Sequence, residues 1–189
     1  MDHSVKFVSM INGDDGNYKM GGGQLAKHRM VEEKEAGKRF GLEYVVIDNH
    51  DGELMLTLEN RLKIICEIRK LNADIVITHR PNDYHPDNRN PALLVQDAAY
   101  LITVPNVARE VPTIQKNPVF LYTKHRFQNP TPFRPDIAVI INLIFDQKIY
   151  TRAANESQYF EWLPWTSWYF DKVPEDEASR LEFLACRRI

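Results

Sequence analysis

The chain has 189 residues, 43% of them hydrophobic, which is enough for a core of ordinary size. Its formal net charge is −2, so the composition predicts neither a nucleic-acid partner nor an anionic membrane surface. It has two cysteines, no apolar stretch of about 18 residues and no signal-peptide pattern at its start. We therefore expect one soluble, cytoplasmic domain over residues 1–189.

Apolar runs alternate with amphipathic segments along the first part of the chain. The β-branched run Val5–Ile11 and the run Tyr44–Asp48 predict strands. Between them, Gln24–Phe40 predicts a charged helix that ends at Gly41, a residue suited to a helix C-terminus. The next segment, Thr57–Leu71, has apolar residues at helical spacing.

The same alternation continues through the rest of the chain. Its expected elements are a strand at Ile75–Ile77, a helix from Asn90–Pro91 to Thr103, apolar runs at Val119–Tyr122 and Ile137–Ile141, and helices over Asn142–Ala154 and Glu175–Cys186. Alternating strands and helices predict an α/β fold with a mostly parallel sheet between helices.

The segment of residues 74–97 carries the densest chemistry. A short apolar strand is followed by a Pro-broken loop with His79, Asp83, His85 and Asp87. A polar loop at the carboxyl end of a buried strand is where open α/β sheets build sites, and these residue types suit metal binding or acid–base catalysis. The alternative is a solvated loop whose side chains cap helix ends.

Residues 78–105, THRPNDYHPDNRNPALLVQDAAYLITVP, resemble a signature block of the N-acetylglucosaminyl-deacetylase-like (PIG-L/LmbE) family, which usually reads HPDH there. Further blocks follow the family's order: NGDDGNYKMGGGQLAKHR, NHDGEL, KNPVFLY, RFQNPTPFRPD and ESQYFEWLPW. The resemblance implies a Rossmann-like three-layer αβα fold. It also implies zinc-dependent hydrolysis of N-acetylglucosamine-type or related N-acyl sugars, which are small-molecule partners.

The resemblance also implies roles for two residues of the polar loop. His85 matches the family histidine that stabilises the oxyanion or protonates the leaving amine, and Asp87 matches the carboxylate that orients it. An Asp two residues from a His can hold its ring and raise its basicity. We therefore take His85 and Asp87 as the candidate catalytic residues.

Three other positions resemble substrate-binding residues of the family: Arg29, Asp51 and Tyr84. An Arg fork and a carboxylate suit sugar hydroxyls and phosphate. Two alternatives stay open, because Arg29 can pair with Glu32 or Glu33 on the surface of its helix, and Asp51 can be a turn residue.

The family's AHPDD motif, which supplies two zinc ligands and the general base, is absent, and with it the first, central strand–helix unit of the family's sheet. Asn88 occupies the position of the third ligand, the last His of HPDH, and Asn155 stands where close relatives have His. A neutral amide is a poor zinc ligand, so we expect no bound zinc and an impaired enzyme. We also expect the place of the missing strand to be closed, either by direct pairing of the Val5 strand with the strand that begins near Asp74 or by a segment from another chain. The alternatives are a non-catalytic sugar-binding protein and a truncated product without a function of its own.

An aromatic patch lies near the end of the chain. Its members are Trp162, Trp165, Trp168, Tyr159, Phe160, Tyr169 and Phe170. Such residues stack on sugars, but they also fill cores and anchor interfaces. We favour packing or a homo-oligomer contact.

Overall fold

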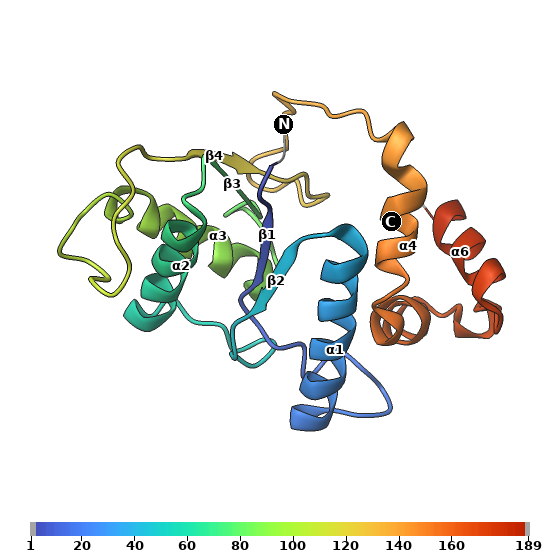
Figure 1. Cartoon of the computed structure of the whole chain (residues 1–189). Helices are drawn as coiled ribbons and strands as arrows, with labels where there is room; N and C mark the ends of the chain where they lie inside the picture. The colour runs from blue at the N-terminus through green and yellow to red at the C-terminus, as the bar shows by residue number, and fades with distance from the viewer. Residues whose placement is uncertain (1–2, 188–189) are drawn as a thin grey trace. The chain divides into compact units, whose positions relative to one another are not determined.

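A computed structural model describes residues 3–187 and divides the chain into two compact units (Figure 1). The outer unit consists of residues 1–51 and 139–189, and the central unit of residues 52–138. That the whole chain acts as a single domain stays a prediction. No helix in residues 3–187 is long and apolar enough to cross a membrane.

The outer unit begins with a strand–helix–strand motif. Strands β1 (Lys6–Ser9) and β2 (Glu43–Val46) are parallel, and α1 (Gly22–Phe40) connects them. Gly41 ends α1 at φ 73°, a left-handed conformation that favours glycine, and its backbone N–H caps the last turn. The two predicted strands and the predicted helix are therefore present, each with slightly different ends.

The remainder of the outer unit is helical. It contains η1 (Asn142–Ile144), α4 (Phe145–Arg152), the π-helical segment η2 (Ser157–Trp162), α5 (Leu163–Thr166), η3 (Phe170–Lys172) and α6 (Glu177–Cys186). Helices α4 and α6 lie side by side over a core of Ile149, Phe160 and Leu184 (Figure 1). Asp176 caps α6 by accepting from the Ser179 N–H at 2.9 Å.

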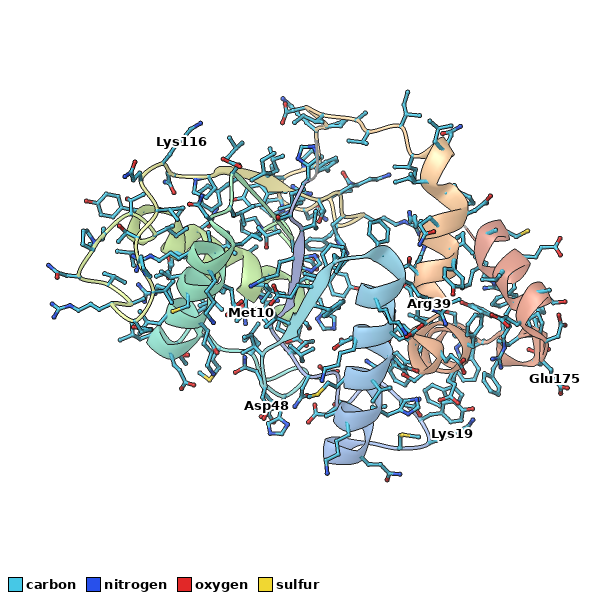
Figure 2. All side chains as sticks on the ribbon, viewed as in Figure 1. Met10, Lys19, Arg39, Asp48, Lys116 and Glu175 are labelled. Atoms are coloured by element: carbon cyan, nitrogen blue, oxygen red, sulfur yellow. The ribbon has the colours of Figure 1, made fainter. Side chains whose placement is uncertain are left out.

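Arg39 joins α1 to α4 within the outer unit (Figure 2). Its Nη1 donates to the Tyr150 carbonyl at 2.9 Å, and its guanidinium lies 4.4 Å from the centre of the Tyr150 ring. A planar guanidinium can make both contacts at once, which a lysine ammonium cannot. The end of α1 and the middle of α4 are thus held together.

The aromatic patch belongs to the outer unit and divides in two. Phe160 lies in the core, and Trp165 is stacked on Trp162 at a centroid distance of 5.5 Å and on Tyr18 at 5.3 Å. Trp168, by contrast, is 93% exposed and has φ 59°. Packing accounts for the first group, while an oligomer contact through the exposed ring stays a prediction.

The central unit consists of α2 (Leu58–Leu71), β3 (Ile75–Thr78), α3 (Pro86–Leu101) and β4 (Val119–Tyr122). Strands β3 and β4 are parallel, and α2 packs on α3. The Thr57 hydroxyl caps α2 by accepting from the Asn60 N–H at 3.2 Å.

A buried arginine on α2 organises the long connection between α3 and β4. Arg69 is 4% exposed, and its guanidinium donates to backbone carbonyls at distances of 2.6–3.1 Å. The acceptors are the carbonyls of Leu101, Ile102, Val104, Val107, Ala108 and Val111. Because buried carbonyls need donors, this one side chain fixes the path of the segment that returns to the sheet.

Two expectations about secondary structure are wrong. Helix α3 starts at Pro86, not at Asn90–Pro91, because the His85 side chain caps it and Pro86 takes the first helical position. Residues 137–141 form no strand, and Ile140 is largely exposed.

Each unit contains one pair of hydrogen-bonded strands. Within residues 3–187, β1 is hydrogen-bonded to β2 and β3 to β4. Direct pairing of the Val5 strand with the strand at Ile75, or closure by a segment from another chain, stays a prediction. Apolar patterning predicted the strands, but it carries no signal for which strands are neighbours.

Candidate functional site

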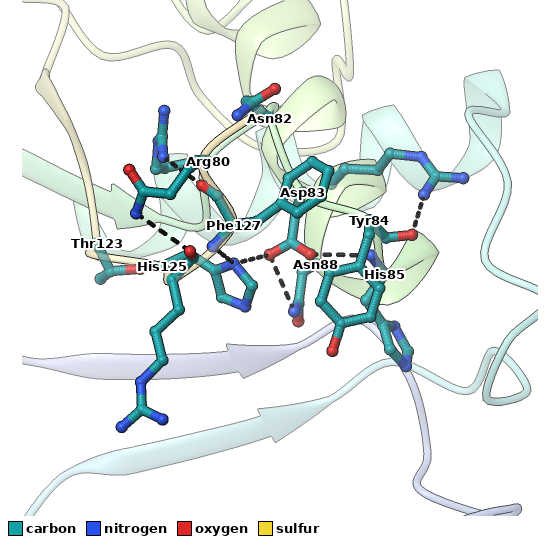
Figure 3. A network of polar contacts seen from close by, with 12 residues as sticks. Arg80, Asn82, Asp83, Tyr84, His85, Asn88, Thr123, His125 and Phe127 are labelled. Atoms are coloured by element: carbon teal, nitrogen blue, oxygen red, sulfur yellow. Dashed lines mark hydrogen bonds and ion pairs between the residues drawn. The ribbon is translucent and has the colours of Figure 1, made fainter. Parts of the chain in front are cut away.

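Asp83 is the centre of a polar network in the central unit (Figure 3). Its side chain has no exposed surface. It accepts from the His85 backbone N–H at 2.9 Å and from Asn88 Nδ2 at 3.2 Å, and it lies 3.3 Å from His125 Nδ1. A buried carboxylate needs donors, and the two hydrogen-bond donors come from the loop after β3 and from α3, while the loop after β4 brings the imidazole of His125 next to it.

His85 lies at the start of α3, where its ring is fixed by the backbone. Nδ1 accepts from the Asp87 N–H at 3.2 Å and lies 4.0 Å from Asp87 Oδ2. The Asp87 carboxylate instead accepts from the Gly52 N–H at 2.7 Å. The ring is therefore oriented by the Asp87 backbone more than by its carboxylate, and in the neutral imidazole the proton lies on Nε2.

Tyr84 is 65% exposed, and its ring lies near two histidines. The centre of its ring lies 6.2 Å from that of His85, 5.9 Å from that of His125 and 5.7 Å from that of Phe127. Arg89 Nη1 donates to the Tyr84 carbonyl at 2.7 Å, which fixes the backbone that carries the ring. Tyr84 thus offers an open aromatic surface beside two imidazoles.

The loop after β4 is anchored by Arg80, whose Nη2 donates to the Thr131 carbonyl at 2.6 Å. His79 is electrostatically coupled to the same network. Burial lowers the pKa of His79; Asp83 acts in the opposite direction, and His125 adds to the lowering. His79 is therefore held towards its neutral form next to the Asp83 network.

Asp51 and Asp14 form a second polar cluster, in the outer unit. The Asp51 carboxylate accepts from the backbone N–H groups of Gly13 at 3.1 Å and Asp15 at 3.4 Å. Asp14 contacts His50 Nδ1 and accepts from the Asp51 N–H at 3.0 Å. Burial alone would raise the pKa of Asp14, but the hydrogen bonds from Asp51 and His50 outweigh it and lower the pKa.

Arg29 also lies in the outer unit, where it donates to the Gly16 carbonyl. Gly13 leaves room for it, because a Cβ there would lie 2.5 Å from Arg29 Cδ. Neither expected partner on the helix forms an ion pair with it within residues 3–187: Glu32 accepts from Ser157, and Glu33 Oε2 is buried without a hydrogen-bond partner. Burial raises the pKa of Glu33 to about 7.

The predicted site residues therefore fall into two groups. Tyr84, His85 and Asp87 are neighbours in the central unit, and Arg29 and Asp51 lie near one loop of the outer unit. Their roles stay predictions.

Sequence reasoning missed two histidines, His50 and His125, each paired with an Asp. Each follows the second strand of a parallel pair by a few residues, which the sequence shows only once the strand pairing is known. The carboxyl ends of parallel strands meet at one edge of a sheet, so the loops that follow them are adjacent.

The side chains that the structure describes do not fit a zinc ion. No group of three His, Cys, Asp or Glu in residues 3–187 converges in a way that could hold a metal. The Asn88 side-chain amide donates to Asp83, and one carboxylate oxygen of Asp87 accepts from the Gly52 N–H. Asp87 Oδ1 is buried without a partner, but a single free oxygen is far from the three ligands that zinc needs.

A family model described as PIG-L, GlcNAc-PI de-N-acetylase, matches residues 1–99. The search of curated proteins gives no significant match.

Solved structures of similar fold support this match. N,N'-diacetylchitobiose deacetylase from Pyrococcus horikoshii superposes with a TM-score of 0.72 at 22% identity, over 90% of this chain and 66% of that one. The 4-carboxy-2-hydroxymuconate hydratase of Pseudomonas putida gives a TM-score of 0.72 at 17% identity, over 90% and 74%. A conserved protein from Thermus thermophilus gives 0.62 at 24% identity, over 82% and 67%. The predicted α/β class with parallel strands is confirmed, and this chain spans about two-thirds of the length of the deacetylase.

Proposed function

This chain belongs to the PIG-L family of GlcNAc-PI de-N-acetylases, and on that premise we propose that it descends from zinc-dependent N-deacetylases but is catalytically impaired as it stands. The substrate class is an N-acetylglucosamine-type or related N-acyl sugar. The observation that carries the proposal is His85, whose ring is fixed at the start of α3 with Nε2–H as its free donor in the neutral form.

The chemistry of the proposed site follows from this donor. In amide hydrolysis, negative charge develops on the carbonyl oxygen, and an N–H aimed at that oxygen stabilises it. His85 Nε2–H is suited to this role. Asp87 supports this role of His85 indirectly. Its backbone N–H fixes the orientation of the His85 ring, and its carboxylate accepts from the Gly52 N–H.

The proposed impairment follows from the missing zinc ligands. Metal-dependent deacetylases activate water on zinc held by three protein ligands. Here Asn88 holds its amide against Asp83, and the described side chains offer no alternative set. We therefore expect no zinc to be bound.

Substrate binding is assigned to Tyr84, Arg29 and Asp51. The open face of Tyr84 suits the apolar side of a sugar ring. Arg29 Nε is buried without a partner in the described part of the chain, which leaves it a donor for a ligand oxygen. A cytoplasmic location and homo-oligomer formation through the Trp168 region belong to the same proposal.

Two alternatives remain distinct from an impaired enzyme. A non-catalytic sugar-binding protein keeps the ligand but does no chemistry, and a truncated product has no function of its own. The folded, hydrogen-bonded loop around Asp83 favours the sugar-binding alternative over the truncated one.

The test combines an assay with a repair. We expect no zinc-dependent acetate release from N-acetylglucosamine derivatives by the unmodified chain, and less than one zinc per chain by elemental analysis. Asn88→His together with an AHPDD-bearing strand–helix unit grafted before His3 should restore activity, whereas either change alone should restore almost none, because zinc ligands act as a unit.

Two controls make the outcome decisive. His85→Ala in the repaired protein should lose about 10²–10⁴-fold, the range typical of general acid–base help. Zinc-dependent release by the unmodified chain, abolished by His85→Ala, would overturn the impairment. A folded, zinc-loaded, repaired protein that cleaves no amide in a broad panel would overturn the deacetylase descent.

A further inference from the structure

Three buried polar atoms of the outer unit have no hydrogen-bond partner among residues 3–187. They are Arg29 Nε, Glu33 Oε2 and Gln158 Oε1. Each belongs to a side chain that is only partly buried as a whole, so solvent and small molecules can approach it. Buried polar atoms in folded proteins almost always have a partner, and an unpaired one indicates a partner that the chain itself does not supply.

The three side chains come from two segments that lie side by side, α1 and η2 (Figure 1). Glu32 joins these segments, because its carboxylate accepts from the Ser157 N–H at 2.7 Å and from the Ser157 hydroxyl at 2.6 Å. Arg29 and Glu33 are four residues apart on α1 and therefore share one face of the helix. The start of η2, with Gln158, is thus held against α1.

Trp162 relates η2 to the Arg29 guanidinium. It follows Gln158 by four residues, about one turn of a π-helix, so the two side chains lie on similar sides of η2. A Cβ at Gly16 would lie 3.1 Å from Arg29 Nη2 and 3.4 Å from Trp162 Nε1. Side chains of α1 and η2 therefore meet at the loop that contains Gly16.

The charges around Arg29 are unfavourable for an anion. Asp51, Glu32 and Glu33 all act electrostatically on Arg29. Burial raises the pKa of Glu33 to about 7, but two carboxylates face the one guanidinium even when Glu33 is protonated. A phosphate placed here would meet like charges in a partly desolvated setting, where they repel strongly.

We propose that Arg29, Glu33 and Gln158 bind the hydroxyl groups of a neutral, unphosphorylated sugar. A hydroxyl both donates and accepts, which matches the Arg29 Nε–H donor and the Gln158 Oε1 acceptor. The Glu33 carboxyl accepts when ionised and can also donate when protonated, so a hydroxyl suits both of its forms. This inference rests on the proposed function, in which Arg29 binds the sugar, and it adds Glu33, Gln158 and the charge of the ligand.

An internal water is the simplest other partner for the same three atoms. Buried waters commonly bridge polar groups of this kind and contribute to stability. In that case the loss of Gln158 Oε1 would change the free energy of unfolding and leave the affinity for sugars unchanged. Affinity and stability, measured on the same variants, therefore separate the two roles.

The first experiment needs only the unmodified full chain. The Arg29 Nε–H signal is followed by nitrogen NMR at pH 7, with its assignment from Arg29→Lys, during titration with N-acetylglucosamine, glucose and N-acetylglucosamine 6-phosphate. We expect both neutral sugars to shift the signal. The 6-phosphate should bind about 10-fold more weakly or worse, because like charges brought together oppose binding.

The second experiment removes the acceptor. Gln158→Met keeps the length of the side chain and should weaken binding of the neutral sugars about 3–10-fold, the effect of one neutral hydrogen bond. Gln24→Met is the matched control, since Gln24 is exposed on α1, and its affinity should equal that of wild type. Urea unfolding of both variants shows that each is folded and measures its stability.

Three outcomes would overturn the proposal: 6-phosphate binding as tight as that of N-acetylglucosamine, an unchanged sugar affinity in Gln158→Met, or no shift of the Arg29 Nε–H signal with any sugar. Failure of the proposed function looks different. There, glucose binds with the expected dependence on Gln158, but N-acetylglucosamine does not bind, so the hydroxyl site is present and the N-acyl sugar is not its ligand.

Discussion

The outer and central units each join an Asp to a His at the carboxyl ends of two parallel strands. Asp14 follows the end of β1 by five residues, and Asp83 follows the end of β3 by five. Their partners, His50 and His125, each come shortly after the second strand of their pair.

The two pairs differ in depth. The His50 side chain is 69% exposed, whereas that of His125 is 28% exposed against a carboxylate with no exposed surface. Topology therefore brings such a pair together, but burial decides what it does: charges in water interact weakly, and the same charges away from water interact strongly. The first pair orders a loop, and the second lies in a buried network that also receives the His85 N–H and Asn88 Nδ2.

The largest expected effect is on stability in the central unit. Asp83→Ala removes the acceptor for the His85 N–H and for Asn88, and with it the carboxylate that lies against His125. We expect a loss of about 3 kcal/mol in the free energy of unfolding, because breaking a buried network leaves its other members unpaired. Urea unfolding measures it, and a loss under 1 kcal/mol would mean that the network is solvated.

Acid should affect the two units in opposite directions. The pKa of Glu33 in the outer unit is raised to about 7, so its contribution to stability is complete below its ordinary value of 4.5 and is lost as the pH rises towards 7. The pKa of His79 in the central unit is lowered, so its contribution is present above 6.5 and is lost as the pH falls through the lowered value.

Hydrogen exchange measured unit by unit between pH 5 and 7 distinguishes the two contributions. For Glu33 we expect about 2–3 kcal/mol, from about 1.4 kcal/mol per pKa unit reduced for partial exposure. Glu33→Gln should abolish the pH dependence of the outer unit alone, and His79→Gln that of the central unit alone. A change of the same sign in both units would contradict the assignment.

A smaller effect is expected for the exposed pair. Asp14→Ala removes an acceptor from the Asp51 N–H and from a largely exposed His50. We expect a loss of about 1–2 kcal/mol, because water can satisfy the exposed histidine more easily than the half-buried Asp51 N–H. Thermal unfolding of Asp14→Ala and Asp83→Ala, measured under the same conditions, tests which variant loses more stability. Equal losses would contradict the argument that burial makes the Asp83 network more important.

The smallest expected effect is a gain in stability. It compares one residue with a positive φ in each unit. Helix α2 ends at Asn72 with φ 51°, and α5 is followed by Trp168 with φ 59°. Asn tolerates this left-handed conformation far better than Trp does. Trp168→Gly should stabilise the chain by about 1 kcal/mol, while Asn72→Gly changes it by a few tenths. If Trp168 packs in an oligomer, the gain becomes a loss, and sedimentation shows the change of size.

Sequence patterns predicted helices and strands better than they predicted contacts. The helix that ends at Gly41 and the strand Val119–Tyr122 follow from local chemistry, and both are present. The start of α3 was misplaced because Pro86 and Pro91 are both allowed near a helix start, and only the His85 cap decides between them.

The site was predicted in part for the same reason. Tyr84, His85 and Asp87 are close in the sequence, so a motif reveals them. His125 reaches Asp83 across more than forty residues, through the pairing of β3 with β4. Strand pairing is set by long-range packing, which leaves no local pattern to detect.

The division of the chain also constrains the order in which it folds during synthesis. The central unit is one continuous segment, residues 52–138, so the ribosome delivers all of it before residue 139 appears. The outer unit starts earlier but must wait for α4 and α6 to complete its core of Ile149, Phe160 and Leu184. Local contacts form sooner than distant ones, so the unit with the Asp83–His125 pair can be built first, while α1 lacks its contacts with α4 until that helix has been made.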